Sequence, residues 1–247
     1  MNCFMRWMRS ILFQIVFYGW TLILCVVFIP TLFFGRRVAY FMPYCWTKSL
    51  PFILKWVCGI KVEIRGLENL PKQNGYIIAS KHQSALETLV FHPIVPNTFF
   101  VLKRELLLLP IAGLYAWATG CVGIDRAGGA VTMRKMLSRV QKNLNKGMNL
   151  VIFPEGTRTK PGTKKPYSPG VALLYEQCRV PVVPVALNSG YFWPKNSVQK
   201  YPGTVIVEFL KPIPAGLHRR AFMDELYDRI EERQDLFKNP FQGENKC

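Results

Sequence analysis

GYIIASKHQSALE, residues 75–87, passes from a short apolar run into a polar cluster and then into a helical pattern. The run 75–80 is typical of a strand that is buried on both faces of a sheet. The spacing of apolar residues after it predicts a helix over 84–91. A buried strand that leads into a helix is the repeating unit of α/β proteins, so this segment indicates that fold class.

The same two patterns alternate along the chain from about residue 60 onward. Further strands are predicted at 61–66, 98–103, 121–124, 149–154, 180–187 and 204–210. Further helices are predicted at 110–118, 129–145, 169–178 and 218–237. Two of them have an apolar stripe: Val131, Met136, Leu137, Val140 and Leu144 in one, and Phe222, Leu226 and Ile230 in the other. This alternation predicts an α/β fold with a mixed, largely parallel sheet flanked by helices.

The N-terminal quarter of the chain has a different character. Residues 10–35 contain no charged side chain, and at about 1.5 Å rise per residue a helix of that length matches a hydrocarbon core of roughly 30 Å. A second apolar stretch, 38–60, contains only Lys48 and Lys55 as charged residues. We therefore expect an N-terminal two-helix membrane arm over 1–59 and an α/β domain over 60–247.

The orientation of this arm is left open by the sequence, because arginines lie on both sides of the first apolar run. The two helices can enter the bilayer and return. Alternatively, they can lie at its surface, with Trp46 and Trp56 at the level of the headgroups. A buried core helix is the third alternative, but the uncharged run is longer than core helices usually are.

Charge favours a membrane surface over a nucleic acid as the partner. The chain has 32 Lys and Arg against 15 Asp and Glu, a formal net charge of +17, while half of its residues are hydrophobic. A basic excess alone fits either partner. Combined with the apolar N-terminal quarter, it favours an anionic bilayer. The seven cysteines include no C-x-x-C pair, so we expect no metal and no bound cofactor.

Three polar clusters directly follow predicted strands: Lys81 to Glu87, Asp125-Arg126, and Glu155 to Arg158. In open α/β sheets, ligands bind beyond the carboxyl ends of parallel strands. If the three strands before these clusters run parallel, the clusters meet at one edge of the sheet. We therefore expect one shared site there.

His82 and Glu87 are candidates for a catalytic pair. Neutral imidazole is the usual proton acceptor near pH 7, and a carboxylate on its other nitrogen holds the correct tautomer. The competing interpretation is structural, because Ser84-Ala-Leu-Glu87 also matches the S-x-x-E capping box. Ser84 is disfavoured as a nucleophile because no G-x-S-x-G motif surrounds it.

The segment Glu155-Gly-Thr-Arg158 indicates a phosphate site. Gly156 and Thr157 offer backbone N–H groups, and Arg158 offers a guanidinium with bidentate geometry. Arg126 repeats the guanidinium after another strand, and two such groups suit a dianion. The alternative is an ordinary turn in which Arg158 is solvated or paired with Glu155.

Four blocks in order, His82-Gln-Ser-Ala-Leu-Glu87, Gly123-Ile-Asp-Arg126, Phe153-Pro-Glu-Gly-Thr-Arg158 and Val180-Pro-Val-Val-Pro-Val185, resemble those of the glycerolipid acyltransferase family. Within that family the chain is most similar to the 1-acyl-sn-glycerol-3-phosphate acyltransferases. The resemblance covers roughly residues 60–215. It departs from the family's H-x4-D pattern at Glu87, where aspartate is usual.

The resemblance implies a reaction and a site. His82 would be the general base on the 2-hydroxyl of 1-acyl-sn-glycerol 3-phosphate (lysophosphatidate), and Glu87 would orient it. The acyl donor would be a thioester, acyl-CoA or acyl-carrier-protein, and the product phosphatidate. Arg126, with Glu155, Gly156, Thr157 and Arg158, would form the acceptor-phosphate site. The apolar segment 105–110 would contact acyl chains or, as the simpler interpretation, belong to the core.

Two alternatives stay open beside this function. One is an acyltransferase of the same fold with another acceptor, such as glycerol 3-phosphate or a lyso-aminolipid. The other is a non-catalytic membrane protein that binds anionic lipid. In each case the arm places the protein on a membrane. For the enzyme, the expected location of the catalytic domain is the cytoplasmic face.

Overall fold

The computed structural model describes residues 3–125 and 128–241, and seven strands within them form one sheet. In chain order the strands are β1 Ile60–Arg65, β2 Ile77–Ser80, β3 Thr98–Lys103, β4 Val122–Ile124, β5 Asn149–Ile152, β6 Val182–Leu187 and β7 Gly203–Phe209. Their order across the sheet is β1-β7-β6-β2-β5-β3-β4. All neighbours pair in parallel except β6 and β7, so the predicted mixed, largely parallel sheet is confirmed.

Each predicted strand is present, and the differences are confined to strand ends. β2 and β6 begin two residues later than expected, at Ile77 and Val182. These two residues lie opposite each other in the parallel register, so both strands start where their mutual pairing starts. Sequence patterns detect the apolar run but not the point at which a neighbour begins to pair.

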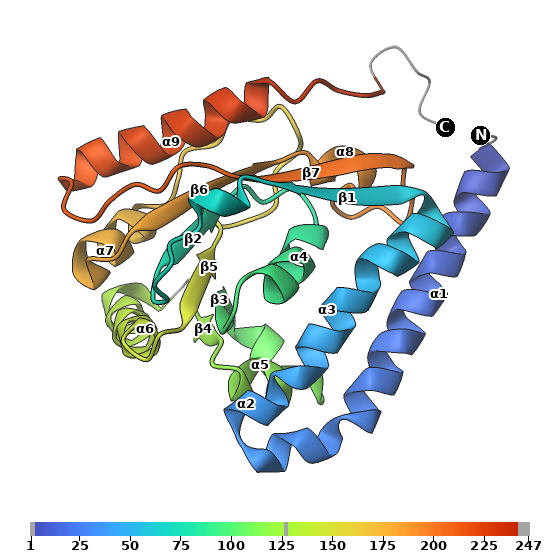
Figure 1. The fold of residues 1–247 in the computed structure, drawn as a ribbon, viewed down its shortest axis with the longest axis horizontal. Helices are drawn as coiled ribbons and strands as arrows, with labels where there is room; N and C mark the ends of the chain where they lie inside the picture. Colours follow the sequence, from blue (N-terminus) through green and yellow to red (C-terminus); the bar gives the residue numbers. More distant parts are fainter. Residues whose placement is uncertain (1–2, 126–127, 242–247) are drawn as a thin grey trace.

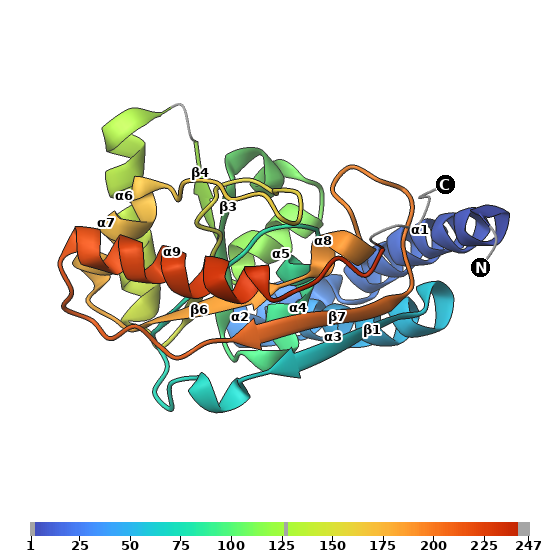
Figure 2. The same ribbon diagram turned by 90° about the horizontal axis from the view of Figure 1, so that it is seen from above.

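Helices cover both faces of the sheet (Figures 1 and 2). One layer consists of α6 (Gly129–Leu144), α7 (Pro169–Cys178) and α9 (Arg219–Asp235), and the other of α1 (Cys3–Val27), α3 (Phe41–Ile53) and α4 (Leu86–Ile94). Successive strand residues alternate between the two layers: in β2, Ile77 packs in the cluster with α6 and α7, and Ile78 in the cluster with α4. Burial on both faces explains why the central strands β2 and β6 are almost continuously apolar, whereas β1 at the edge of the sheet alternates.

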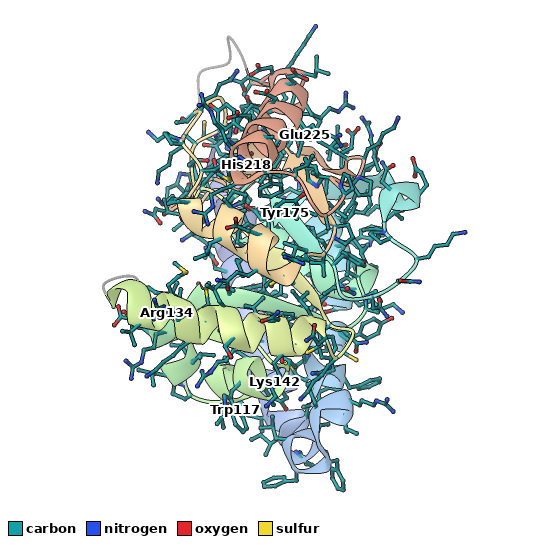
Figure 3. The ribbon with its side chains drawn as sticks, turned by 90° about the vertical axis from the view of Figure 1, so that its left-hand side faces the viewer. Trp117, Arg134, Lys142, Tyr175, His218 and Glu225 are labelled. Carbon is teal, nitrogen blue, oxygen red and sulfur yellow. The ribbon has the colours of Figure 1, made fainter. Side chains whose placement is uncertain are left out.

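The amphipathic helices follow their predicted stripes with one exception. In α9, Phe222, Leu226 and Ile230 are fully buried, as expected. In α6, four of the five expected apolar residues are buried, but Val131 lies exposed in the first turn. The helix begins at Gly129, and its first turn projects beyond the neighbouring α7 (Figure 3).

Short helical segments connect these elements. They are η1 (Ile29–Phe34), α2 (Arg36–Ala39), η2 (Leu54–Cys58), η3 (Leu67–Asn69), η4 (Arg104–Leu108), α5 (Ala112–Ala118) and α8 (Ser189–Phe192). α5 was predicted, whereas α8 was not, because four residues are too few to show a helical period. The segment 105–110 does not join the core: Leu106, Leu108 and Leu109 are all exposed.

The N-terminal segment forms two helices, α1 and α3, that lie side by side and are joined through η1 and α2 (Figure 1). Phe13 of α1 is fully buried and packs edge-on against Trp193, 5.2 Å between ring centroids. Arg9 Nε donates to the carbonyl of Val57 at 2.6 Å. α1 is thus fastened to the α/β domain along one face, while most of its other side chains are exposed, which argues against the core-helix alternative.

Within residues 3–125 and 128–241, only α1 is long and apolar enough to cross a membrane. α3 has 13 residues and continues without a break in its αR backbone into the five residues of η2. Trp46 does not face outward as the interfacial arrangement requires. It packs against Phe17 between the helices and donates from Nε1 to Thr21 Oγ1 at 2.9 Å. Trp56 is exposed. The membrane role of the pair and the division at residue 59 stay predictions.

The burial of Phe13 predicts that α1 contributes to the stability of the α/β domain. Phe13→Ala should lower the free energy of unfolding by about 3–5 kcal/mol, because it opens a cavity between α1 and Trp193. Ile15→Ala, at an exposed position of the same helix, should change it by less than about 0.5 kcal/mol. Denaturant unfolding of both variants in one detergent measures the difference. Equal stability of the two variants would show that α1 does not pack on the domain.

Candidate functional site

The carboxyl ends of β2, β4 and β5 lie at one edge of the sheet, because these strands run parallel. A cavity of about 990 Å³ opens at this edge. Its lining includes His82, Asp125, Glu155, Gly156 and Thr157. The three polar clusters that follow the strands therefore meet at one place. Arg126 lies outside the described residues.

His82 is held on three sides. Its Nδ1 lies 3.1 Å from Glu87 Oε1, its ring stacks on Phe153 at 4.0 Å between centroids, and its backbone N–H donates to Glu155 Oε2 at 2.8 Å. The side chain is 16% exposed and lines the cavity. Because Nδ1 is engaged by the carboxylate, Nε2 is the nitrogen that can accept a proton from a molecule in the cavity.

Glu87 belongs to both interpretations offered by the sequence. It is fully buried, and Oε1 accepts from the backbone N–H groups of Gln83 and Ser84 at 2.5 and 2.7 Å, as well as contacting His82. Ser84 Oγ accepts from the backbone N–H of Leu86 at 2.8 Å. The carboxylate of Glu87 therefore has both roles: it belongs to the capping box, and it is the partner of His82. Ser84 is itself buried and donates to Glu87 Oε2 at 3.0 Å, which leaves it inside this network.

Ser189 completes the environment of Glu87, and sequence reasoning missed it. Its hydroxyl donates to Glu87 Oε2 at 2.9 Å from α8, which follows β6 at the same edge of the sheet. Residues 81–85, between β2 and α4, form the histidine loop. α8 lies very close to it, since a Cβ on Gly190 would meet Gln83 Cβ at 2.8 Å. Ser189 is 102 positions from Glu87, so only the tertiary fold reveals the contact.

A second buried carboxylate, that of Glu155, supports the histidine loop by accepting from the backbone of His82. Glu155 bonds Lys81 Nζ at 2.8 Å and Thr159 Oγ1 at 2.6 Å, and Lys81 also pairs with Glu231 of α9 at 2.6 Å. All three charged side chains are nearly fully buried. Glu155 was predicted as part of a phosphate loop, but its side chain binds Lys81 and the backbone of His82. Lys81 and Glu231 were not anticipated.

The loop after β5 places the other predicted phosphate ligands. Gly156 adopts φ +68°, which favours glycine, and its N–H donates to Phe153 O at 2.9 Å to close a tight turn. Thr157 lines the cavity. Arg158 is partly exposed and is not among the described residues that line it. The alternative in which Arg158 pairs with Glu155 does not occur, because Glu155 pairs with Lys81 instead.

The cavity extends from His82 into an apolar region between the sheet and the N-terminal helices. Two lysines, Lys103 at the end of β3 and Lys165 in the loop before α7, reach its lining. His92 also lines it, and burial lowers the pKa of this imidazole to about 4, so it is neutral at pH 7. The apolar wall is formed by side chains from both layers of helices and from β3, including Cys25, Met42, Trp46, Leu89, Phe100, Leu102, Leu106, Ala112, Ala116, Met133, Val171 and Leu174.

No group of three or more potential metal ligands occurs in the part of the chain that the structure describes. The site thus offers a histidine with a carboxylate partner, nearby lysines and a long apolar cavity. This arrangement suits proton abstraction from an amphipathic molecule with an anionic group.

Comparison with known proteins identifies the family. A family model described as Acyltransferase matches residues 61–188. The chain belongs to the acyltransferase family. A 1-acyl-sn-glycerol-3-phosphate acyltransferase of Pseudomonas aeruginosa is 37% identical over 181 residues, 72% of this chain and 68% of the relative. The human 1-acyl-sn-glycerol-3-phosphate acyltransferase alpha is 33% identical over 221 residues, 88% of this chain and 77% of the relative.

The fold of this acyltransferase also matches a solved structure. The 1-acyl-sn-glycerophosphate (LPA) acyltransferase PlsC from Thermotoga maritima superimposes with a TM-score of 0.77 at 20% identity, covering 94% of this chain and 99% of that one. At this identity the match supports the fold alone. The resemblance to glycerolipid acyltransferases drawn from the four sequence blocks is confirmed, as is the prediction of an O-acyltransferase.

The double role of Glu87 predicts a separation between folding and catalysis. Glu87→Gln keeps an oxygen for the capping bonds but removes the charge that stabilises a protonated His82. We expect kcat to fall about 100-fold or more with nearly unchanged thermal stability. The control is Glu176→Gln, an exposed carboxylate of α7. Near-normal activity of Glu87→Gln would leave Glu87 only its capping role.

The contact from α8 predicts a smaller effect at Ser189. Ser189→Ala removes one of the hydroxyl groups that hold Glu87 Oε2, so kcat should fall about tenfold, the effect of losing one hydrogen bond to a charged group. KM for both substrates should stay the same, because Ser189 acts through Glu87. Steady-state kinetics of this variant and of Ser138→Ala, at an exposed position of α6, measure the effect. A change in KM with normal kcat would contradict a positioning role.

Proposed function

We propose that this acyltransferase transfers a fatty acyl group from a thioester to the 2-hydroxyl of lysophosphatidate, with His82 as the general base. The observation that supports it most directly is His82 in the cavity lining with Nδ1 held by buried Glu87. The relatives that cover most of the chain are named for the same acceptor.

The proposed step is a direct transfer. Nε2 of His82 takes the hydroxyl proton of the acceptor while the hydroxyl oxygen attacks the thioester carbonyl carbon. The tetrahedral intermediate then collapses: the C–S bond breaks, and the proton passes from His82 to the departing thiolate. The products are phosphatidate and free thiol, so the balance needs no oxidant or other reactant. Glu87 stabilises the imidazolium that exists between the two proton transfers.

The acceptor's phosphate would bind at the loop after β5. Gly156 and Thr157 border the cavity beside His82. The guanidinium groups of Arg158 and Arg126 and the ammonium groups of Lys103 and Lys165 are the candidate counter-charges. Lys103 lies at the end of β3, which pairs with β4. Arg126 follows β4 in the chain. A dianionic headgroup is suited to several such cations, because charge-assisted hydrogen bonds to phosphate are among the stronger contacts a protein makes.

The apolar part of the cavity would hold acyl chain. Its walls run from the histidine loop to α1, α3 and α5, with few polar groups besides neutral His92. A cavity of about 990 Å³ is at the upper end of the range typical for small-molecule sites, consistent with a lipid ligand. No cofactor is needed for this chemistry, because acyl-CoA or acyl-carrier-protein enters as a co-substrate.

The proposed location is the membrane surface, with the α/β domain on the cytoplasmic face. One long apolar helix, a net charge of +17 and a membrane-resident acceptor support this placement. The soluble donor then reaches the site from the cytoplasm. Nucleic acid is not a proposed partner. An anionic bilayer, which the apolar N-terminal helix would contact, already explains the excess of positive charge.

Family membership favours the enzyme over the non-catalytic lipid-binding alternative. Glycerol 3-phosphate and lyso-aminolipids remain the competing acceptors. An acceptor that lacks a phosphomonoester would make little use of the cations around the loop after β5.

Purified protein incubated with lysophosphatidate and labelled acyl-CoA, or acyl-carrier-protein in parallel, tests the proposal. The wild type should form phosphatidate, and His82→Ala should lower kcat by about 1000-fold. His218→Ala, which changes an exposed histidine at the start of α9, is the matched control and should retain activity. Acylation of glycerol 3-phosphate or a lyso-aminolipid, with none of lysophosphatidate, would assign the enzyme to the alternative acceptor.

A further inference from the structure

The end of the molecule around α5 (Figure 1) carries large apolar side chains that are exposed in the described structure. We call it the tip surface, formed by η4 and α5 with η1 beside them. Leu108 is 75% exposed and Trp117 is 74% exposed. The remaining large exposed side chains are Phe33, Phe34, Leu106, Leu109 and Leu114, of which Leu106 also lines the cavity. Scattered exposed leucines are ordinary, but a contiguous group that includes tryptophan and two phenylalanines marks an interaction site.

The composition of α5 shows that this exposure is built into the helix. Ala112-Gly-Leu-Tyr-Ala-Trp-Ala118 has no charged residue. Its inner face buries Tyr115 against Leu24, Cys25 and Met42 of the N-terminal helices. Its outer face, where a helix in water would present polar residues, presents Leu114 and Trp117 instead. Of the two sequence interpretations of 105–110, the core is wrong for the same reason: Leu108 and Leu109 are exposed. Leu106 lines the cavity, so the acyl-chain interpretation stays a prediction.

Positive charge borders the tip surface. Lys103 and Arg104 lead into η4, and both are exposed, although Lys103 pairs with Glu105 at 3.0 Å. α6 contains no acidic residue and exposes Arg134, Lys135, Arg139 and Lys142. Asn143 Nδ2 of this helix donates at 2.9 Å to the carbonyl of Gly120, two residues after the end of α5.

We propose that the tip surface is a second bilayer-contacting surface, separate from α1, that inserts its leucines and Trp117 into an anionic phospholipid leaflet. Tryptophan and leucine on one face and lysine and arginine at the border are the pattern of interfacial membrane contacts. An acidic carrier protein would account for the cations of α6 but not for the bare leucines and Trp117. The observations therefore favour lipid.

This surface also explains how the acceptor arrives, a consequence that rests on the proposed function. The inner sides of the same two segments, at Leu106, Ala112 and Ala116, line the cavity that contains His82. A lysophosphatidate molecule in the leaflet is thereby separated from the apolar cavity only by η4 and α5. The acceptor enters from the bilayer at the tip surface, while the water-soluble donor does not need it.

A direct readout of insertion does not depend on activity. The full-length protein is reconstituted on phosphatidylcholine vesicles containing phosphatidylglycerol, with bromine-labelled acyl chains that quench tryptophan on contact. Replacing Trp117 by Phe should remove a clearly measurable part of the bromine-dependent quenching, because an inserted tryptophan contributes to it. The same fraction of quenching in Trp117→Phe and the wild type would overturn the proposal.

The functional readout uses Leu108→Glu/Trp117→Glu, which adds charge outside the cavity lining. Activity on vesicle-embedded lysophosphatidate should fall about tenfold or more, and activity on monomeric short-chain lysophosphatidate should stay within about twofold of wild type. The matched control, Leu67→Glu/Leu236→Glu, changes two exposed leucines away from the tip surface and should keep both activities.

Three outcomes contradict the proposal. Full activity of the tip variant on vesicles shows that the surface is not used, and equal loss on both forms of the acceptor shows damage to the enzyme itself. A loss confined to reactions with acyl-carrier-protein, and absent with acyl-CoA, assigns the surface to a protein partner. Wild-type protein that acylates neither form of lysophosphatidate refutes the proposed function instead, while the quenching result still decides the bilayer contact.

Discussion

The buried carboxylate of Glu87 joins three separate parts of this acyltransferase. It accepts hydrogen bonds from the backbone of Gln83 and Ser84, from the hydroxyls of Ser84 and Ser189, and it contacts His82. A fully buried carboxylate is costly unless its oxygen atoms are satisfied, and here donors converge on both of them. The start of α4, the orientation of the imidazole and the position of α8 therefore depend on one another. A change at any of these three places is expected to disturb the histidine.

The neighbouring ion cluster extends this dependence to the outer layer. Lys81, adjacent to His82 in the chain, lies between Glu155 and Glu231. Removing one partner of such a cluster would leave an uncompensated buried charge, which typically costs about 3–5 kcal/mol. α9 is thus coupled to the histidine loop although it contributes nothing to the cavity lining described. On the opposite side, Trp193 directly follows α8 and packs on Phe13, so α1 is coupled to the same loop through Ser189.

Much of the architecture and part of the site could be predicted because they depend on local patterns. Apolar runs, and an alternating pattern at 61–66, located all seven strands, and periodicity located the buried face of α9. The placement of His82 near Gly156 and Thr157 followed from one rule, that parallel strands present their carboxyl ends at the same edge. Contacts made by distant segments were not predicted. The ion pair of Glu155 with Lys81 was missed, and the core interpretation of 105–110 was wrong because no distant segment that the structure describes covers Leu108 and Leu109.

The amino-acid sequence by itself determined the α/β class, the order of strands and helices, the long apolar helix at the N-terminus and the histidine with its carboxylate partner. These features arise from residues close together in the chain, where spacing and burial preference suffice. Only the tertiary structure decided that Ser189 and Lys81 support the site, that Trp46 lies between the helices, and that α5 exposes Trp117. Each of these depends on which segments contact each other after folding. A local sequence pattern carries no information about the distance in space between segments that are far apart in the chain.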